Sequence, residues 1–94
     1  MEQIQRIRYM EELLERTAQA VHDLEAALDG YASVQNELRE LTDYYEGPLW
    51  RRDFEADEQG TLPDDLKRGV LSEDAVYDLL TDNDELLSRL AAYR

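Results

Sequence analysis

Carboxylates gathered around a glycine make a calcium loop the first chemistry to test in this sequence. In "EADEQGTLPDDL", aligning Gly60 with the sixth position of an EF-hand loop places Glu55, Asp57 and Gln59 at positions one, three and five. Position twelve, where the loop requires a bidentate glutamate, is then Leu66. The calcium loop is therefore incomplete, and weak, loosely organised binding of Mg²⁺ or Ca²⁺ by these carboxylates is kept only as an alternative.

A single histidine limits the catalytic chemistry that remains. His22 follows the apolar Val21, and we expect its ring to lie on the surface. Gln19 stands three residues earlier, so the Glu-x-x-His motif of di-metal helical bundles is absent. With this one histidine the sequence shows no Ser-His-Asp arrangement, and we expect no cleft that would support one. The sequence also has no phosphate-binding glycine loop and no cysteine. We therefore predict that the protein is not an enzyme and uses no cofactor and no structural metal.

The chain is strongly acidic, with 23 Asp and Glu against 10 Lys and Arg and a formal net charge of −13. This charge repels nucleic acid and anionic membranes, so we expect neither as a partner. An acidic inhibitor that imitates nucleic acid is one alternative function. Basic pairs at Arg51-Arg52 and Lys67-Arg68 interrupt the acids, which argues against this alternative. The same pairs bracket six acids, so ion pairing is expected to fold this region back on itself.

With 94 residues the chain is expected to form a single domain over residues 1–94 with a thin core. Its apolar runs are far shorter than the roughly 18 residues that a membrane span needs. The N-terminal stretch "MEQIQRIRYMEELLE" is charged throughout and resembles no secretory signal. These features predict a cytoplasmic protein.

An apolar seam in the first third of the chain predicts a long helix over about residues 3–28. Its members recur at alternating spacings of three and four, which is typical of a helix that packs on other helices. They are Ile7, Met10, Leu14, Thr17, Val21, Leu24, Leu28 and Tyr31. We expect the seam, Met10 included, to be buried in the core.

The register of the seam slips at Tyr31, just after Asp29-Gly30. Glycine commonly follows a helix end, so we predict a break there and a second helix over about residues 33–46. One kinked helix from about residue 3 to 46 is the alternative. In the second helix we expect one of Tyr44 and Tyr45 to face the core and the other to face water.

The C-terminal segment predicts a third long helix, over about residues 73–92. Its apolar stripe consists of Val76, Leu79, Leu80, Leu86, Leu87 and Leu90. Asn83 lies within the stripe, either as a buried polar residue that sets register or as a wet or bent point. Packed together, the helices predict an all-α fold, an antiparallel three-helix bundle of coiled-coil character with a short helical crossover before the last helix.

The crossover begins at Gly47-Pro48 and is predicted to hold a short helix over about residues 49–57. Trp50 and Phe54 lie four residues apart on one face of that helix. We interpret them as anchors that hold the crossover on the bundle. Stacking on a ligand is the alternative.

Residues 62–74, "LPDDLKRGVLSED", are interpreted as a connector rather than a site. Pro63 suits the start of a helical turn over about residues 63–68, which Gly69 is expected to end in the left-handed conformation. Ser72 is a good N-cap for the last helix. Leu71 and Val76 stand at the positions of a hydrophobic staple, so we expect them to pack together.

The stretch "DYYEGPLWRRDFEADEQGTLPDDLKRGVLSEDAVYDLL" resembles the signature of a family of small bacterial proteins known only as domain of unknown function 4298. The match runs from about Tyr44 to Leu80. The resemblance implies no catalytic residue, because the family has no assigned activity. We therefore predict a non-enzymatic module for interaction with another protein or with itself, for example as a homodimer. The candidate interaction residues are Tyr44, Trp50, Phe54, Lys67 and Arg68.

Overall fold

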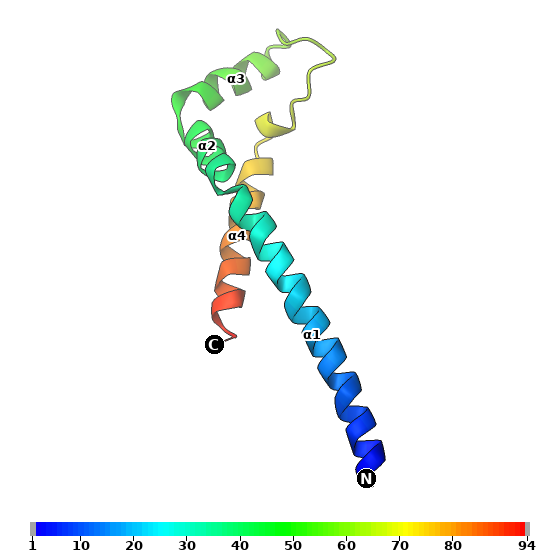
Figure 1. Cartoon of the computed structure of the whole chain (residues 1–94). Coiled ribbons are helices and arrows are strands. Elements are labelled where there is room, and N and C mark those ends of the chain that lie inside the picture. The colour runs from blue at the N-terminus through cyan, green and yellow to red at the C-terminus, as the bar shows by residue number, and fades with distance from the viewer. Residues whose placement is uncertain (1, 94) are drawn as a thin grey trace. The chain divides into compact units, whose positions relative to one another are not determined.

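A computed structural model describes residues 2–93, which form four α-helices and one short 3₁₀ helix with no strand, so the predicted all-α class is confirmed (Figure 1). The elements are α1 (Gln3–Ser33), α2 (Gln35–Glu46), α3 (Pro48–Glu58), η1 (Gly69–Leu71) and α4 (Ala75–Ala91). The chain divides into two compact units, residues 1–36 and 37–94, which are described separately.

In the first unit, α1 is one uninterrupted helix of 31 residues. At its start the carboxylate of Glu2 accepts a hydrogen bond from the backbone N–H of Gln5, at 2.8 Å. The helix continues through Gly30, so the break predicted at Asp29-Gly30 is wrong. A glycine inside a helix costs only about 1 kcal/mol relative to alanine, and no proline follows to stop the helix.

The helix ends at Val34 instead, where the backbone leaves the helical conformation. Carbonyls of the last turn are satisfied locally: the Ser33 hydroxyl donates to the Gly30 carbonyl at 2.6 Å. The amide side chain of Gln35 donates to the Tyr31 carbonyl at 2.9 Å. Because α2 begins at Gln35, a single residue separates the two helices, and the second helix starts close to its predicted position.

In the second unit, the Gly47-Pro48 pair separates α2 from α3 as predicted. Gly47 is the N-cap of α3, and Pro48 stands at the first helical position, where its missing N–H leaves no partner unsatisfied.

A Schellman turn ends α3. Gly60 has a φ of 70°, its N–H bonds the Asp57 carbonyl at 3.1 Å, and the N–H of Thr61 bonds the Ala56 carbonyl at 3.1 Å. Gly60 is the one glycine of the described residues with a positive φ, so the left-handed conformation predicted for Gly69 is wrong. Residues 63–66 form only a single hydrogen-bonded turn, which leaves no helix for Gly69 to end; Gly69 begins η1.

α4 begins at Ala75 with Asp74 as its N-cap, so the N-cap predicted at Ser72 is wrong, although the Ser72 hydroxyl accepts the backbone N–H of Ala75 at 3.2 Å. Leu71 and Val76 are 5% and 3% exposed and are the buried hydrophobic residues of the described chain, so the burial of the predicted staple pair is confirmed. η1 contacts both α3 and α4. The core of the second unit therefore lies at η1. The predicted three-helix bundle stays a prediction, because the stripe along the rest of α4 is open.

Substitution of Gly60 and Gly30 tests whether a helix ends at each glycine. The structure places a helix end at Gly60, whereas the sequence predicted one at Gly30. Gly60→Ala is expected to lower the free energy of unfolding by about 1 kcal/mol, since a side chain resists a positive φ although no atom lies within 4 Å of the added Cβ. Gly30→Ala, equally unobstructed but helical, is expected to raise it by about 0.5–1 kcal/mol. Urea unfolding followed by far-ultraviolet circular dichroism measures both. Destabilisation by Gly30→Ala would contradict the continuous α1.

Candidate interaction surfaces

An aromatic cluster joins the end of α2 to α3 in the second unit. The rings of Tyr45 and Trp50 meet edge to face, with centroids 5.1 Å apart, and Phe54 stacks on Trp50 at 5.1 Å and 16°. The indole N–H of Trp50 donates to the Val70 carbonyl at 2.9 Å, a bond across twenty residues of chain. Trp50 therefore anchors α3 to η1. This bond joins two parts of the crossover, so anchoring of the crossover on the bundle by Trp50 and Phe54 stays a prediction.

An ion pair also links α3 to the connector that precedes η1. The guanidinium of Arg68 donates to the carboxylate of Asp57 at 2.9 Å, and the two side chains are 34% and 29% exposed. The prediction that ion pairing folds this region back on itself is confirmed for this pair. At this exposure its contribution is no more than about 1 kcal/mol, so it adds to the packing at η1 and does not replace it.

Tyr44 lies beside this cluster and donates its hydroxyl hydrogen to the carboxylate of Asp53 at 2.5 Å. Loss of water around the ring, followed by the hydrogen bond to Asp53 and the negative charge of that carboxylate, raises the pKa of Tyr44 to about 12. Tyr44 and Tyr45 are both half-buried, so the predicted division into one buried and one wet ring is wrong. Both side chains contact α3, one through Asp53 and the other through Trp50.

Four of the five candidate residues make contacts within the second unit. Trp50 and Phe54 stack on each other, Tyr44 and Arg68 bond separate carboxylates of α3, and Lys67 is exposed in the connector. A binding role for these residues stays a prediction.

Sequence reasoning did not identify the partners of these residues. Asp53 and Asp57, which receive Tyr44 and Arg68, stand four residues apart and so lie on one face of α3. That spacing could have predicted that the two carboxylates lie side by side and are able to receive partners from elsewhere in the chain. No side-chain pattern could single out the backbone carbonyl of Val70.

The first unit carries an open apolar surface, the seam of α1, formed by the residues from Ile7 to Tyr31 named above. Its apolar members are 37–63% exposed, and no residue of α1 is buried. Met10 is 52% exposed, so its predicted place in the core is wrong. An open hollow of about 350 Å³ lies along the middle of the seam. Its lining residues are Leu14, Thr17, Ala18, Val21, His22 and Glu25.

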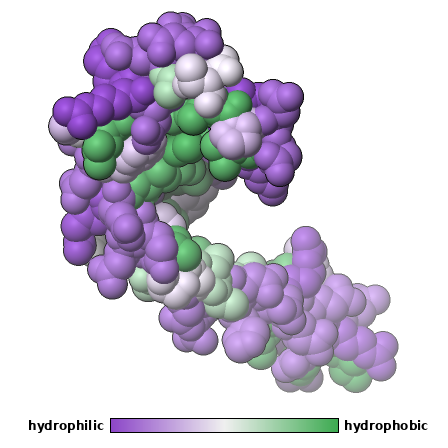
Figure 2. Space-filling model, turned by 90° about the horizontal axis from the view of Figure 1, so that it is seen from above, coloured by the Kyte–Doolittle hydropathy of each residue, from purple (hydrophilic) through white to green (hydrophobic). Residues whose placement is uncertain are grey.

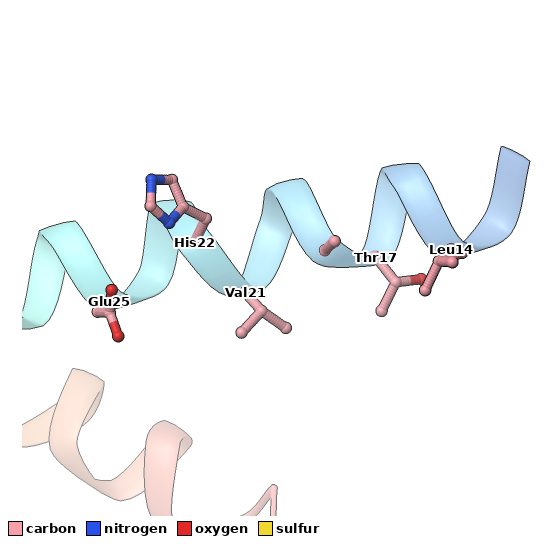
Figure 3. A pocket seen from close by; sticks show the side chains of 6 residues that line it. Leu14, Thr17, Val21, His22 and Glu25 are labelled. Atoms are coloured by element: carbon pink, nitrogen blue, oxygen red, sulfur yellow. The ribbon is translucent and has the colours of Figure 1, made fainter. Parts of the chain in front are cut away.

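Figure 3 shows that Leu14, Thr17 and Val21 project from one side of α1, whereas His22 projects from the other. The predicted surface position of His22 is confirmed by its exposure. The hollow is therefore apolar along the seam. His22 is the one histidine that lines it, and no lysine or arginine does.

α4 carries a second open apolar face. Leu79, Leu86, Leu87 and Leu90 are 44–55% exposed, whereas Val76 at the start of the helix is buried. Asn83, within this face, is half-buried and has an interaction partner. In Figure 2 apolar surface lies open among the hydrophilic side chains that cover much of the face in view.

Among residues 2–93, no three His, Asp or Glu side chains come together in a group that could hold a metal ion. Glu55 and Asp57 lie within α3, so the backbone that a calcium loop would need is helical there. None of the helices in this part of the chain combines the length and the apolar character of a membrane span.

One comparison with known proteins gives a match. A family model described as Domain of unknown function (DUF4298) matches residues 7–92. No curated protein and no solved structure matches the chain.

Removal of the indole donor tests the anchor. Trp50→Phe keeps an aromatic ring for Phe54 but removes the hydrogen bond to Val70, and it is expected to lower the free energy of unfolding by about 1 kcal/mol. Tyr45→Phe is the matched control, because it removes a hydroxyl from the same cluster and keeps the edge contact. Urea unfolding measures both, and equal losses in the two variants would contradict an anchoring role for the indole.

The phenol of Tyr44 is expected to ionise only as the pH approaches about 12. Because the folded-state pKa lies above the ordinary value near 10, the contribution to stability is complete below about pH 10 and is lost as the pH rises through about 12. Asp53→Asn is expected to move the Tyr44 titration toward lower pH. Ring-carbon chemical shifts, assigned by comparison with Tyr44→Phe, follow it, and an unchanged titration in Asp53→Asn would contradict the stated cause.

Proposed function

The chain belongs to the DUF4298 family, whose description assigns no activity, and from its open apolar faces we propose that it is a non-enzymatic module for protein–protein interaction or self-association. The observation that carries the proposal is the α1 seam. Its apolar members repeat at helical spacing over residues 7–31 and are all exposed. A continuous apolar stripe of this length, flanked by charged residues, marks a surface that another helix covers.

The lengths of the helices support a partner outside the seam's own unit. At about 1.5 Å per residue, the 31 residues of α1 extend about 46 Å, whereas α2 and α4, with 12 and 17 residues, extend about 18 and 26 Å. Neither shorter helix can cover the seam over its whole length. In the antiparallel three-helix bundle predicted from the sequence, α2 and α4 would cover only part of the seam, so a helix from another chain would be needed even in that packing.

Binding of another helix would stabilise the complex through burial. Burying a leucine, isoleucine, valine or methionine side chain contributes about 1.5–3 kcal/mol relative to full exposure. Because the apolar seam residues are 37–63% exposed before binding, each contributes about half of that. Summed over a seam of this length, the burial is sufficient to offset the entropy of association.

The other functions considered from the sequence have less support. An acidic nucleic-acid mimic needs an uninterrupted face of carboxylates, and Arg6, Arg8 and Arg16 lie among the acids of α1. Weak divalent-metal binding has no carboxylate cluster in the described residues to carry it. The absence of an enzymatic activity and the absence of a nucleic-acid or membrane partner are parts of the proposal. So is a cytoplasmic location, because a chain without cysteine needs no oxidising compartment.

Charged substitutions in the seam test the proposal. Leu14→Asp with Leu24→Asp places two carboxylates in the contact. We expect it to weaken association at least about a hundredfold, because the complex no longer buries two leucines that are 62% and 47% exposed and must desolvate two charges instead. Gln5→Asp with Gln19→Asp adds the same two charges outside the seam and is expected to retain association. Sedimentation velocity measures self-association, and capture of one stoichiometric partner protein by wild type and both variants measures binding to another protein.

Far-ultraviolet circular dichroism shows whether the variants keep their helices. The proposal fails if the wild-type chain stays monomeric and captures no partner. It also fails if the seam variant, still helical, associates as tightly as the control.

A further inference from the structure

Building on the proposed function, we infer that the partner of the α1 seam is the α1 seam of a second copy of this chain, in parallel orientation and in register. The helix has the pattern of a two-stranded coiled coil. Assigning Ile7 to heptad position a gives a complete a/d series through residue 31, about three and a half heptads. Position a holds Ile7, Leu14, Val21 and Leu28, and position d holds Met10, Thr17, Leu24 and Tyr31. β-branched residues at a with leucine at d favour two parallel strands, and Ile7, Val21 and Leu24 follow this pattern, whereas the other five seam positions do not.

The charges beside the seam favour the parallel orientation. In a parallel pair, each g residue faces the e residue of the following heptad in the other strand. Arg6 at g then faces Glu11 at e of the second copy, and twofold symmetry forms this attractive pair twice. The later g and e positions on both sides contain only one charge, Glu25, which faces Ala20. No like charges meet along the interface.

Arg6 and Glu11 are available for this pairing. Both side chains are exposed, and neither makes a hydrogen bond or ion pair with another described residue. The remaining charges of the helix, such as Arg8, Glu12 and Asp23, fall at positions b, c and f, which face water in a two-stranded pair.

The antiparallel arrangement is disfavoured by the same residues. Reversing the seam on itself with full overlap centres the contact between Thr17 and Val21 and brings e positions together. Glu11 then faces Glu25 of the second copy, twice. A shift by one heptad separates these acids, but it leaves two seam residues at one end of each helix, for example Leu28 and Tyr31, without a partner. The parallel register alone covers all eight seam residues with no like-charge contact.

Orientation is tested by single cysteines, which are unambiguous because the chain has none of its own. Met10→Cys, at d, is expected to form a covalent homodimer in a glutathione redox buffer, because equivalent d residues of parallel strands lie within disulfide reach. Glu12→Cys, on the outer face of the same turn, is the control and is expected to stay monomeric on a non-reducing gel. Mixing Met10→Cys with a tagged Leu28→Cys chain reports the antiparallel pair, in which these two positions would meet.

Charge exchange tests the register. Arg6→Glu sets two glutamates against each other at both symmetric positions and is expected to weaken the dimer about tenfold in sedimentation equilibrium. Arg8→Glu makes the same charge change at a b position and is expected to alter dimerisation less than about twofold. Arg6→Glu combined with Glu11→Arg restores opposite charges and is expected to return the affinity close to that of wild type.

The inference is overturned by a dominant Met10–Leu28 cross-link, by an assembly larger than a dimer, or by equal effects of Arg6→Glu and Arg8→Glu. A chain that is monomeric alone, but that loses a different protein partner when Leu14 and Leu24 are replaced by Asp, also overturns it while the proposed function stands. Loss of both associations overturns the two together.

Discussion

The second unit depends on one short turn, η1, because two of its three α-helices, α2 and α3, are too short to be stable alone. Isolated helices below about 12–15 residues are marginal in water, and α2 and α3 have 12 and 11. η1 supplies the buried Leu71, contacts α3 and α4, and offers the Val70 carbonyl to the Trp50 indole. The Schellman turn at Gly60 and the Arg68–Asp57 pair return the chain so that η1 reaches α3. Capping, hydrogen bonding and burial thus act on the same few residues.

The first unit is held together differently. α1 is long enough for its own backbone hydrogen bonds to support it, and none of its residues is buried. The seam of α1 therefore forms no hydrophobic core within the first unit. The exposed apolar residues of the seam have no structural role in an isolated helix. We therefore explain them by a partner that covers them. This contrast is the physical reason for assigning interaction to α1 and structural support to the crossover.

Local patterns predicted the second unit well and the first unit less well. The burial of Leu71 and Val76 and the Gly47-Pro48 boundary each follow from a few neighbouring residues, and both predictions were correct, whereas the N-cap of α4 is Asp74 and not Ser72. The two errors over glycine have one origin. Sequence shows where a glycine permits a left-handed turn, but the conformation is decided by what precedes it, and α3 ends before Gly60 whereas no helix ends before Gly30 or Gly69. The seam was recognised from its spacing, but periodicity shows only that a face is apolar and not which chain buries it.

The stretch that carries the family resemblance is also the stretch that folds the second unit. Trp50, Asp57, Arg68 and Leu71 all lie within it, and each takes part in a contact that joins α3, η1 and the connector. The contacts of these four residues within the fold explain their presence, and no substrate needs to be invoked. A functional surface has to be sought where side chains are not already used, and the longest such surface is the α1 seam. Because its flanking charges are sparse and its one g-to-e ion pair is near the N-terminal end, orientation rests on few electrostatic contacts, whereas affinity rests on the apolar series. Substitutions at Leu14 and Leu24 and substitutions at Arg6 and Glu11 therefore address separate properties of the same interface.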